Sequence, residues 1–126
     1  MTLQVGFEGK GSQAGIGRKE PVPMTGFVEA LVESAFGISR SALRTPGRGT
    51  ARVAFARQVA IYLSHVHLGL TYSAAGRFFG RDRTTAAHAC GVIEERRENA
   101  SLDSLLDCLE RAIDIRRRSD AWSDRA

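Results

Sequence analysis

Apolar residues recur every three or four positions over most of the chain, which is the spacing of one face of an α-helix. The stripe that begins at Phe27, Val28 and Leu31 is the first example. The pattern predicts five helices, at about residues 25–36, 51–68, 72–79, 83–98 and 101–117. No segment alternates between apolar and polar residues as a half-buried strand does. We therefore predict an all-α fold of about five helices.

Residues with turn and capping chemistry separate these helices. Gly37 and Gly69 are suited to end the helices that precede them. Thr71 can cap the helix of 72–79 by accepting a hydrogen bond from a free backbone amide. Gly80 permits a left-handed turn, and Asp82 stands where an N-cap belongs. Two helices joined by so short a turn indicate a helix-turn-helix over about residues 71–98.

The remaining segments do not follow the helical period. Residues 1–23 contain five glycines and two prolines, which favours a flexible arm, and an inert tail is the simpler interpretation of it. Residues 38–50 mix arginine with serine, proline and glycine and are predicted to form a basic connection. We expect one helical domain over residues 24–118 and a frayed tail over residues 119–126.

Composition and motifs exclude several classes of protein. No apolar run approaches the roughly 18 residues of a membrane span, and no secretory signal is visible. Two cysteines without a paired spacing favour reduced thiols and a cytoplasmic location. The sequence contains no phosphate-binding loop, no catalytic pair of carboxylates and no nucleophile with an adjacent base. We therefore expect that the protein does not bind a nucleotide and is not an enzyme. His65 and His67 point to different sides of a helix, so we expect no metal or other cofactor.

Charge is concentrated in the middle of the chain. The formal net charge is +4, yet residues 38–83 alone hold eight arginines and one aspartate, a net charge of +7. The flanking segments are slightly acidic. A cluster of arginine around a helix-turn-helix indicates double-stranded DNA as the partner.

The second helix of the motif has an outward face suited to close approach. The residues along this face have small or hydrogen-bonding side chains: Thr84, Ala87, His88 and Gly91. The first acidic residue of this helix is Glu94. Recognition helices contact base edges with their N-terminal residues. Here Arg83 can donate two hydrogen bonds to guanine, Asp82 can accept from cytosine, and Thr84 can contact thymine through its methyl group.

The block Gly80-Arg81-Asp82-Arg83-Thr84-Thr85-Ala86-Ala87-His88-Ala89, with Ala56-Arg57-Gln58 upstream, resembles the signature of a known domain. It is similar to the C-terminal DNA-binding domain of the bacterial replication initiator DnaA, over about residues 27–115. The resemblance implies an all-helical fold like that of this domain and of the Trp repressor. It also implies binding to short DnaA boxes, with one helix in the major groove and a loop arginine in the minor groove.

Site residues follow from the matching positions. The resemblance implies base contacts from Asp82, Arg83 and Thr84, and a minor-groove contact from Arg48, with Arg44 as the second choice. The predicted contacts to the DNA backbone are Arg44, Arg52, Arg57, Thr71, Tyr72, Arg81, Thr85 and His88. His88 and Tyr72 can alternatively be ordinary packed side chains.

The chain also departs from the family pattern. Arg83 stands where the initiator usually has histidine, which can shift base preference toward guanine. Phe79-Gly80 replaces a common Gly-Gly pair, and Gly91 and Val92 stand where basic residues are common. The initiator's ATPase module has no counterpart in these 126 residues.

The predicted function is sequence-specific binding of double-stranded DNA at DnaA-box-like sites by a nucleoid-associated protein that regulates replication initiation or transcription. The alternative is an adaptor that keeps the fold and binds the initiator, RNA polymerase or a replisome component. The absent basic residues at Gly91 and Val92 and the acidic C-terminal third favour this alternative slightly.

Overall fold

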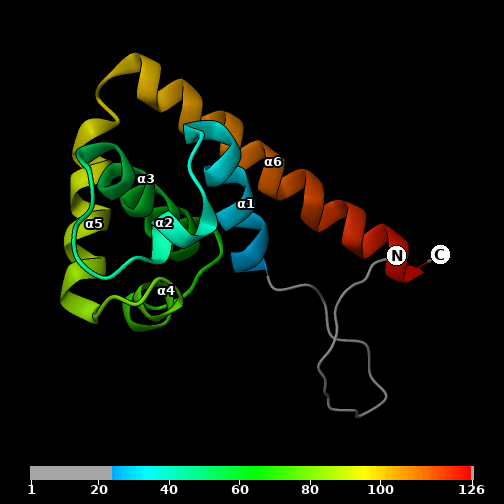
Figure 1. The fold of residues 1–126 in the computed structure, drawn as a ribbon. Helices are drawn as coiled ribbons and strands as arrows, with labels where there is room; N and C mark the ends of the chain where they lie inside the picture. Colours follow the sequence, from blue (N-terminus) through cyan, green and yellow to red (C-terminus); the bar gives the residue numbers. More distant parts are fainter. Residues whose placement is uncertain (1–23, 126) are drawn as a thin grey trace, which may run out of the picture.

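The computed structural model describes residues 24–125, so the predicted arm of residues 1–23 lies outside the described part of the chain. Every regular element in this range is helical, which confirms the all-α prediction (Figure 1). The elements are α1 (Met24–Phe36), α2 (Arg40–Arg44), α3 (Ala51–Tyr62), the π-helical turn η1 (Leu63–His67), α4 (Tyr72–Phe78), α5 (Arg83–Arg96) and α6 (Ala100–Arg125).

Helix α3 is the centre of the molecule. It packs against α1, α2, α4 and α5, and its inner residues Ala56, Val59 and Ala60 are fully buried. Small side chains at these positions let the neighbouring helices approach closely, as ridges fit into grooves. The inner face of α3 is therefore the centre of the core, whereas Val66 beyond it, on the inner stripe that the helical period predicts, is 47% exposed.

The turn between α4 and α5 depends on two glycines. Gly80 has a φ of +71°, which a residue with a side chain rarely adopts. Gly76 lies in α4 where the chain crosses back toward α5, and its carbonyl accepts from the Arg81 amide at 2.8 Å. Buried Phe79 fills the inside of this corner. The predicted helix-turn-helix is thus present, with α4 and α5 packed on each other.

Side-chain caps begin five of the helices, including α6, where the Asn99 side-chain oxygen accepts from the Leu102 amide at 3.0 Å. Thr71 accepts from the Ala74 amide at 3.0 Å and Asp82 from the Thr85 amide at 2.8 Å, which confirms both predicted caps. Ser39 caps α2 and Thr50 caps α3 in the same manner.

Three boundaries differ from the hydrophobic pattern. A short helix, α2, forms within the predicted connection of 38–50, because Ser39 caps it and Leu43 is fully buried. The predicted helix of 51–68 changes to a π-helical turn at Leu63. The predicted frayed tail after Arg118 is instead helical to Arg125.

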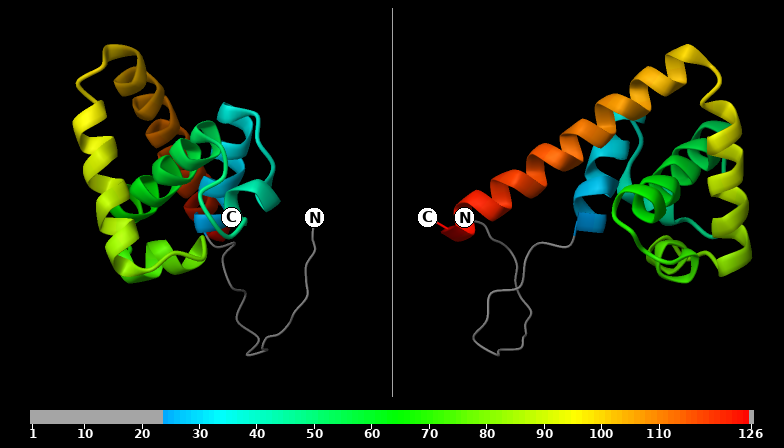
Figure 2. Two further views of the ribbon diagram at one scale, coloured as in Figure 1. Left: turned by 60° about the vertical axis from the view of Figure 1, so that its left-hand side comes forward. Right: turned by 180° about the vertical axis from the view of Figure 1, so that it is seen from behind.

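The continuation of α6 has local causes. No glycine or proline interrupts residues 101–125. Arg116 pairs with Asp120 one turn later at 3.2 Å, and its guanidinium lies over the Phe27 ring of α1. Figure 2 shows that α6 crosses α1 and then runs on beyond the other helices.

One arginine holds the corner between α5 and α6. The Arg97 guanidinium donates to Asp103 at 2.6 Å, Asp107 at 2.8 Å and Glu110 at 3.0 Å, and also to the Tyr62 hydroxyl. Partial burial works against its charge, but these hydrogen bonds outweigh burial and raise the pKa of Arg97. Arg97 therefore stays charged and ties α6 to α3.

Within residues 24–125, no helix combines the length and the apolar character needed to cross a membrane.

We predict opposite effects from alanine at two helical glycines. A Cβ at Gly76 would lie 2.8 Å from the Arg81 carbonyl oxygen and 3.0 Å from that of Asp82, so Gly76→Ala is expected to cost about 1–3 kcal/mol. Gly91 has open space around it, so Gly91→Ala is expected to stabilise by roughly 0.5–1 kcal/mol. Urea unfolding followed by circular dichroism measures both. Equal stability of Gly76→Ala and wild type would contradict the close packing of this corner.

Candidate nucleic-acid interface

The first turn of α5 presents polar side chains to solvent. Asp82, Arg83, Thr84 and Thr85 are all exposed. Hydrogen bonds from the Thr85 backbone amide and hydroxyl, and from the Thr84 amide, lower the pKa of the Asp82 carboxyl, which is therefore ionised at neutral pH. In the cap, the Thr85 amide donates to Oδ1 of Asp82 at 2.8 Å.

The rest of α5 separates into an inner and an outer face. Its inner residues Ala86, Ala89, Cys90 and Ile93 are buried. Burial raises the pKa of the Cys90 thiol to about 11, so Cys90 behaves as an apolar core residue. On the outer face Thr84, His88 and Gly91 are exposed and Ala87 is half-buried. A face this free of bulk can approach a groove of DNA closely.

A hollow lies between α5 and the loop of residues 45–50. It measures about 520 Å³ and is lined on the loop side by Gly47 and Arg48, and on the α5 side by Thr85 and His88. A second hollow of about 300 Å³ continues along α5 from Arg48 past His88 to Arg96. Arg48 and His88 border both hollows. The structure thus brings the predicted minor-groove arginine to the same side as the recognition helix.

Arg81 connects the loop to the motif turn. Its Nη2 donates to the carbonyl oxygens of Thr45 at 3.0 Å and Gly47 at 2.7 Å. Its Nη1 donates to the Phe79 carbonyl at 3.2 Å. This guanidinium therefore fixes the loop beside α5, a role that the sequence does not indicate.

The sequence predicts that Arg57 contacts the DNA backbone, but in the structure this residue lies inside the molecule. Only 5% of it is exposed. Its Nε donates to the Leu43 carbonyl at 2.7 Å, and its two terminal nitrogens donate to the carbonyls of Arg48 and Ala42, each at 3.3 Å. Desolvation, with a smaller effect of Arg81, lowers the pKa of Arg57. Because all three nitrogens are bound to backbone, the side chain cannot reach a phosphate without breaking these bonds.

Arg44 and Arg52 also make internal contacts. Arg44 forms a two-bond ion pair with buried Glu29, at 2.8 and 3.0 Å, and its guanidinium lies 4.5 Å from the centre of the Phe78 ring. The hydrogen bond to Glu29 raises the pKa of Arg44. Arg52 donates to the carbonyls of Phe36 and Gly37 at the end of α1. The prediction of DNA contacts by these two residues competes with these bonds.

Thr71 and Tyr72 lie together at the start of α4. The Thr71 hydroxyl is the helix cap and is exposed. The Tyr72 ring is half-buried and stacks on His65, with ring centroids 4.1 Å apart. His65 in turn contacts the Leu70 carbonyl at 2.7 Å, whereas His67 contacts Asp114 on α6 at 2.9 Å. The two histidines thus have different partners, in agreement with their spacing.

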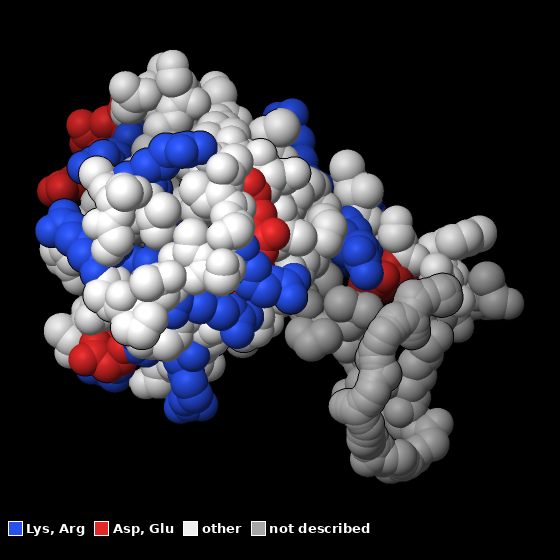
Figure 3. Space-filling model, in the orientation of Figure 1, with Lys and Arg blue, Asp and Glu red and all other residues white. Residues whose placement is uncertain are grey.

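The exposed positive charge comes from fewer residues than the sequence suggests. Among the described residues of the segment 38–83, Arg48, Arg77 and Arg83 make no internal ion pair or side-chain hydrogen bond, while Arg40 pairs with Glu29 and Glu33. Figure 3 shows basic side chains over the side formed by α5, the 45–50 loop and α4, with small acidic patches among them.

Two contributors to this side are missing from the predicted site. Gln58 of α3 lines both hollows. Arg96 borders the second hollow and lies over the Phe55 ring, 5.2 Å from its centre. The Arg57-Gln58 pair in the sequence is a signal that could have found Gln58. Nothing in the sequence marks Arg96, because it is one arginine among several charged residues at the end of α5.

The sequence of this helical domain is similar to sequences of known proteins. Residues 27–93 match the family described as the bacterial DnaA protein helix-turn-helix. Over 78 residues the chain is 36% identical to the chromosomal replication initiator protein DnaA of Desulfatibacillum aliphaticivorans. That alignment covers 61% of this chain and 17% of the relative, so the chain matches only a small part of the relative's length.

We predict that Arg57→Ala destabilises the fold, because the carbonyls of Leu43, Arg48 and Ala42 each lose a hydrogen bond, and only that of Ala42 keeps another donor, the Thr45 amide. The expected loss is about 2–4 kcal/mol in the free energy of unfolding, measured by urea titration. Arg77→Ala is the matched control: Arg77 is exposed on α4, and its loss should change stability by less than about 0.5 kcal/mol. An Arg57→Ala protein as stable as the control would show that the loop does not depend on this guanidinium.

Proposed function

Since the chain belongs to the bacterial DnaA helix-turn-helix family, we propose that it binds double-stranded DNA sequence-specifically at sites resembling DnaA boxes. The observation that carries this proposal is the position of Arg48 across a shallow hollow from the exposed N-terminal turn of α5. An α-helix fills the major groove, and a neighbouring loop can then reach the adjacent minor groove.

The α5 turn supplies the proposed base readout. Arg83 is exposed, makes no internal ion pair within residues 24–125, and can donate two parallel hydrogen bonds to guanine O6 and N7. Thr84 and the carboxylate of Asp82 follow it as contacts to thymine and cytosine. Because the cap holds Asp82 in place, its carboxylate meets a base with little loss of side-chain entropy.

Arg48 supplies the proposed minor-groove contact. Narrow A·T-rich minor grooves have enhanced negative potential and attract inserted arginine. The loop that carries Arg48 is bound at Thr45 and Gly47 by Arg81 and at its own carbonyl by Arg57. These bonds support a loop that holds its shape before DNA arrives, which lowers the entropy cost of binding.

Thr71, Thr85 and His88 are the proposed phosphate contacts, since all three are exposed on the same motif. Tyr72 is a weaker candidate because its ring is stacked on His65. Arg81 contributes through the loop that it holds, and Arg77 on the last turn of α4 is added as an exposed charge beside the motif. Such contacts position a protein on DNA and carry no sequence information.

The biological outcome that we propose is regulation of replication initiation or of transcription in the cytoplasm. The alternative is an adaptor function without DNA affinity, in which the fold binds the initiator, RNA polymerase or a replisome component. One observation favours it: Arg44, Arg52, Arg57 and Arg81 bond to the protein itself, which leaves little free charge for phosphate. Genome-wide mapping of bound sites distinguishes regulated promoters from a replication origin.

We predict that the full chain prefers a duplex with a DnaA box over a scrambled duplex, and that Arg83 provides much of this preference. Arg83→Ala should weaken box binding by about 1–3 kcal/mol and scrambled binding far less. Arg83→Lys keeps the charge and loses the two-bond geometry, so it should restore the nonspecific part alone. Fluorescence anisotropy with both duplexes measures this. Equal binding of wild type to the two duplexes contradicts specificity and favours the adaptor.

We predict a different effect for the loop. Arg48→Ala should weaken the box duplex, reduce the preference for A·T pairs beside it, and lower the slope of log affinity against log salt by about one. Arg117→Ala is the control, because it removes an exposed arginine from α6, away from the motif. An Arg48→Ala protein that matches this control in affinity and salt slope would leave the loop without a role in binding.

A further inference from the structure

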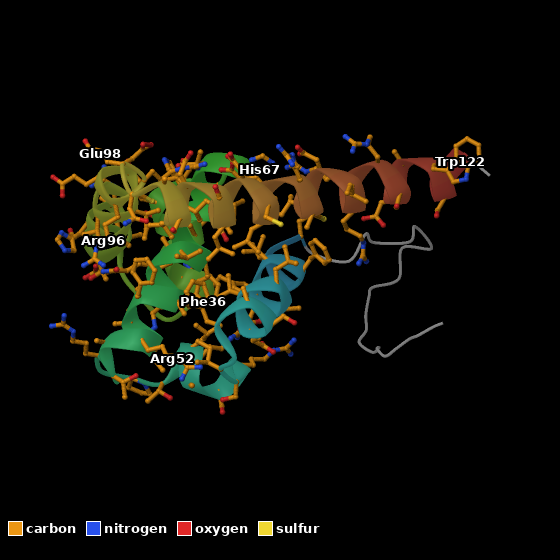
Figure 4. The ribbon with its side chains drawn as sticks, turned by 90° about the horizontal axis from the view of Figure 1, so that it is seen from above. Phe36, Arg52, His67, Arg96, Glu98 and Trp122 are labelled. Atoms are coloured by element: carbon orange, nitrogen blue, oxygen red, sulfur yellow. The ribbon has the colours of Figure 1, made fainter. Side chains whose placement is uncertain are left out.

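The C-terminal half of α6 extends beyond the body of the domain. The first part of this 26-residue helix is packed on the domain through the buried side chains of Leu106, Leu109 and Ile113. After Ile113 the helix runs away from α3, α4 and α5, as the views in Figures 1 and 2 agree. Figure 4 shows Trp122 at its far end. The last turns of α6 therefore leave most of their surface in contact with solvent.

A row of apolar and small residues follows this projecting part. Cys108, Ala112, Ile115, Ser119 and Trp122 are separated alternately by four and three residues, which aligns them on one face of a helix. We name this row the α6 stripe. Ile115 is 57% exposed and Trp122 is 69% exposed, and Trp122 is the only tryptophan in the chain. Large apolar side chains exposed together on one face are typical of an interaction surface.

The α6 stripe is distinct from the buried face of the same helix. The two faces point in different directions: Ile113 and Ile115 are two residues apart at 100° per residue, so their side chains point about 160° from each other, and only Ile113 is buried. The half-buried Ala112 lies where the stripe meets the body. The stripe is therefore left over after α6 has packed on α1.

The charges beside the stripe are basic. Arg111 and Arg118 each follow a stripe residue by three positions, so they border it, and both are exposed. The acids between Asp103 and Asp114 have partners on the body of the domain: Asp103, Asp107 and Glu110 pair with Arg97, and Asp114 contacts His67 and also lies within electrostatic range of Arg118. On the other border, Arg116 is paired with Asp120. The free charge along the stripe is thus positive.

We propose that the α6 stripe is a docking surface for an acidic amphipathic helix of a partner protein. The apolar side chains of the partner pack on Ile115 and Trp122, and its carboxylates pair with Arg111 and Arg118. Tryptophan and arginine are the residues that most often dominate binding energy at interfaces. A helix laid along an apolar strip is a common mode of peptide recognition.

The charge argues against a second copy of this chain as the occupant. If two α6 stripes pair in parallel, the flank with Arg111 and Arg118 faces the other copy's opposite flank, where Arg116 and Asp120 already pair with each other, so the two arginines gain no free carboxylate. Paired antiparallel about Ile115, they bring Arg111 of one copy beside Arg118 of the other. Like charges in contact destabilise the antiparallel arrangement, and the parallel one leaves both arginines without an acidic partner. An acidic partner removes this repulsion.

The position of the stripe makes docking independent of DNA. The N-terminal turn of α5 and the 45–50 loop lie on the opposite side of the molecule from the end of α6 (Figures 1 and 2). DNA and the acidic helix can therefore be bound together, so that the domain links a DNA site to a second protein. This role goes beyond the DNA binding proposed above and does not require it.

The first experiment uses two designed helical peptides with the same leucine stripe, one flanked by glutamate and the other by lysine. Added to the full chain, the glutamate peptide should bind and move the emission of Trp122 to shorter wavelength, because the indole leaves water. The lysine peptide should bind at least tenfold more weakly. Added salt should weaken the glutamate peptide. Equal binding of both peptides, or binding without the change in Trp122 emission, would overturn the proposal.

The second experiment uses variants and a fluorescein-labelled glutamate peptide. Trp122→Ser and Arg118→Glu should each weaken binding at least tenfold. Arg117→Glu is the charge control on the opposite side of α6, and Val66→Ser is the apolar control, since Val66 is 47% exposed on η1. Both controls should bind within twofold of wild type. Unchanged binding by Trp122→Ser would place the peptide elsewhere and refute the docking surface.

DNA binding and oligomeric state complete the test. Box-duplex affinity should be the same in wild type and Trp122→Ser, which keeps this proposal separable from the proposed function. Sedimentation of the full chain alone should give a monomer. A dimer that Trp122→Ser dissociates would assign the stripe to a second copy and overturn the acidic partner.

Discussion

The fold of this domain depends on a guanidinium that donates to backbone carbonyls in and beside the interior. Arg57 binds the carbonyls of Ala42, Leu43 and Arg48, and so joins the end of α2 and the 45–50 loop to the central helix α3. Burying a charge is costly, and lone carbonyls in the interior are costly too. One planar group with several donors offsets both costs at once. The proposed DNA-binding loop therefore has its shape because an arginine was removed from the surface.

Arginines around the 45–50 loop have two different roles: some bind groups of the protein itself, and others are exposed to solvent. Arg57 and Arg81 bind loop carbonyls, and Arg44 pairs with the buried carboxylate of Glu29. Arg48 and Arg83 remain on the outside. Because Arg57, Arg81 and Arg44 are bound within the protein, we expect fewer counterions to be released on DNA binding than a net charge of +7 suggests. Preorganisation of a few side chains takes the place of many weak contacts.

The molecule has two separate ends. At one end, α4, α5 and the loop form a single polar side, with Gly76 and Gly80 setting the angle between the motif helices. At the other, α6 carries an apolar face past the core (Figure 4). Arg97 holds the corner between them by binding three carboxylates of α6 and the Tyr62 hydroxyl. A rigid corner of this kind fixes the direction of α6 relative to the proposed DNA side.

Sequence alone determined the elements whose physics is local. The 3.6-residue period gave the buried faces of α3 and α5, and short polar side chains gave the caps at Thr71 and Asp82. The motif that contains Asp82 and Arg83 could be found because its residues are contiguous. Tertiary structure decided what depends on distant partners. Arg48 and Arg57 are alike in sequence, and only the folded loop supplies the carbonyls that bind one and leave the other free. Likewise, nothing in the local pattern says where the core ends, so the exposure of Trp122 was settled by how far α1 reaches along α6.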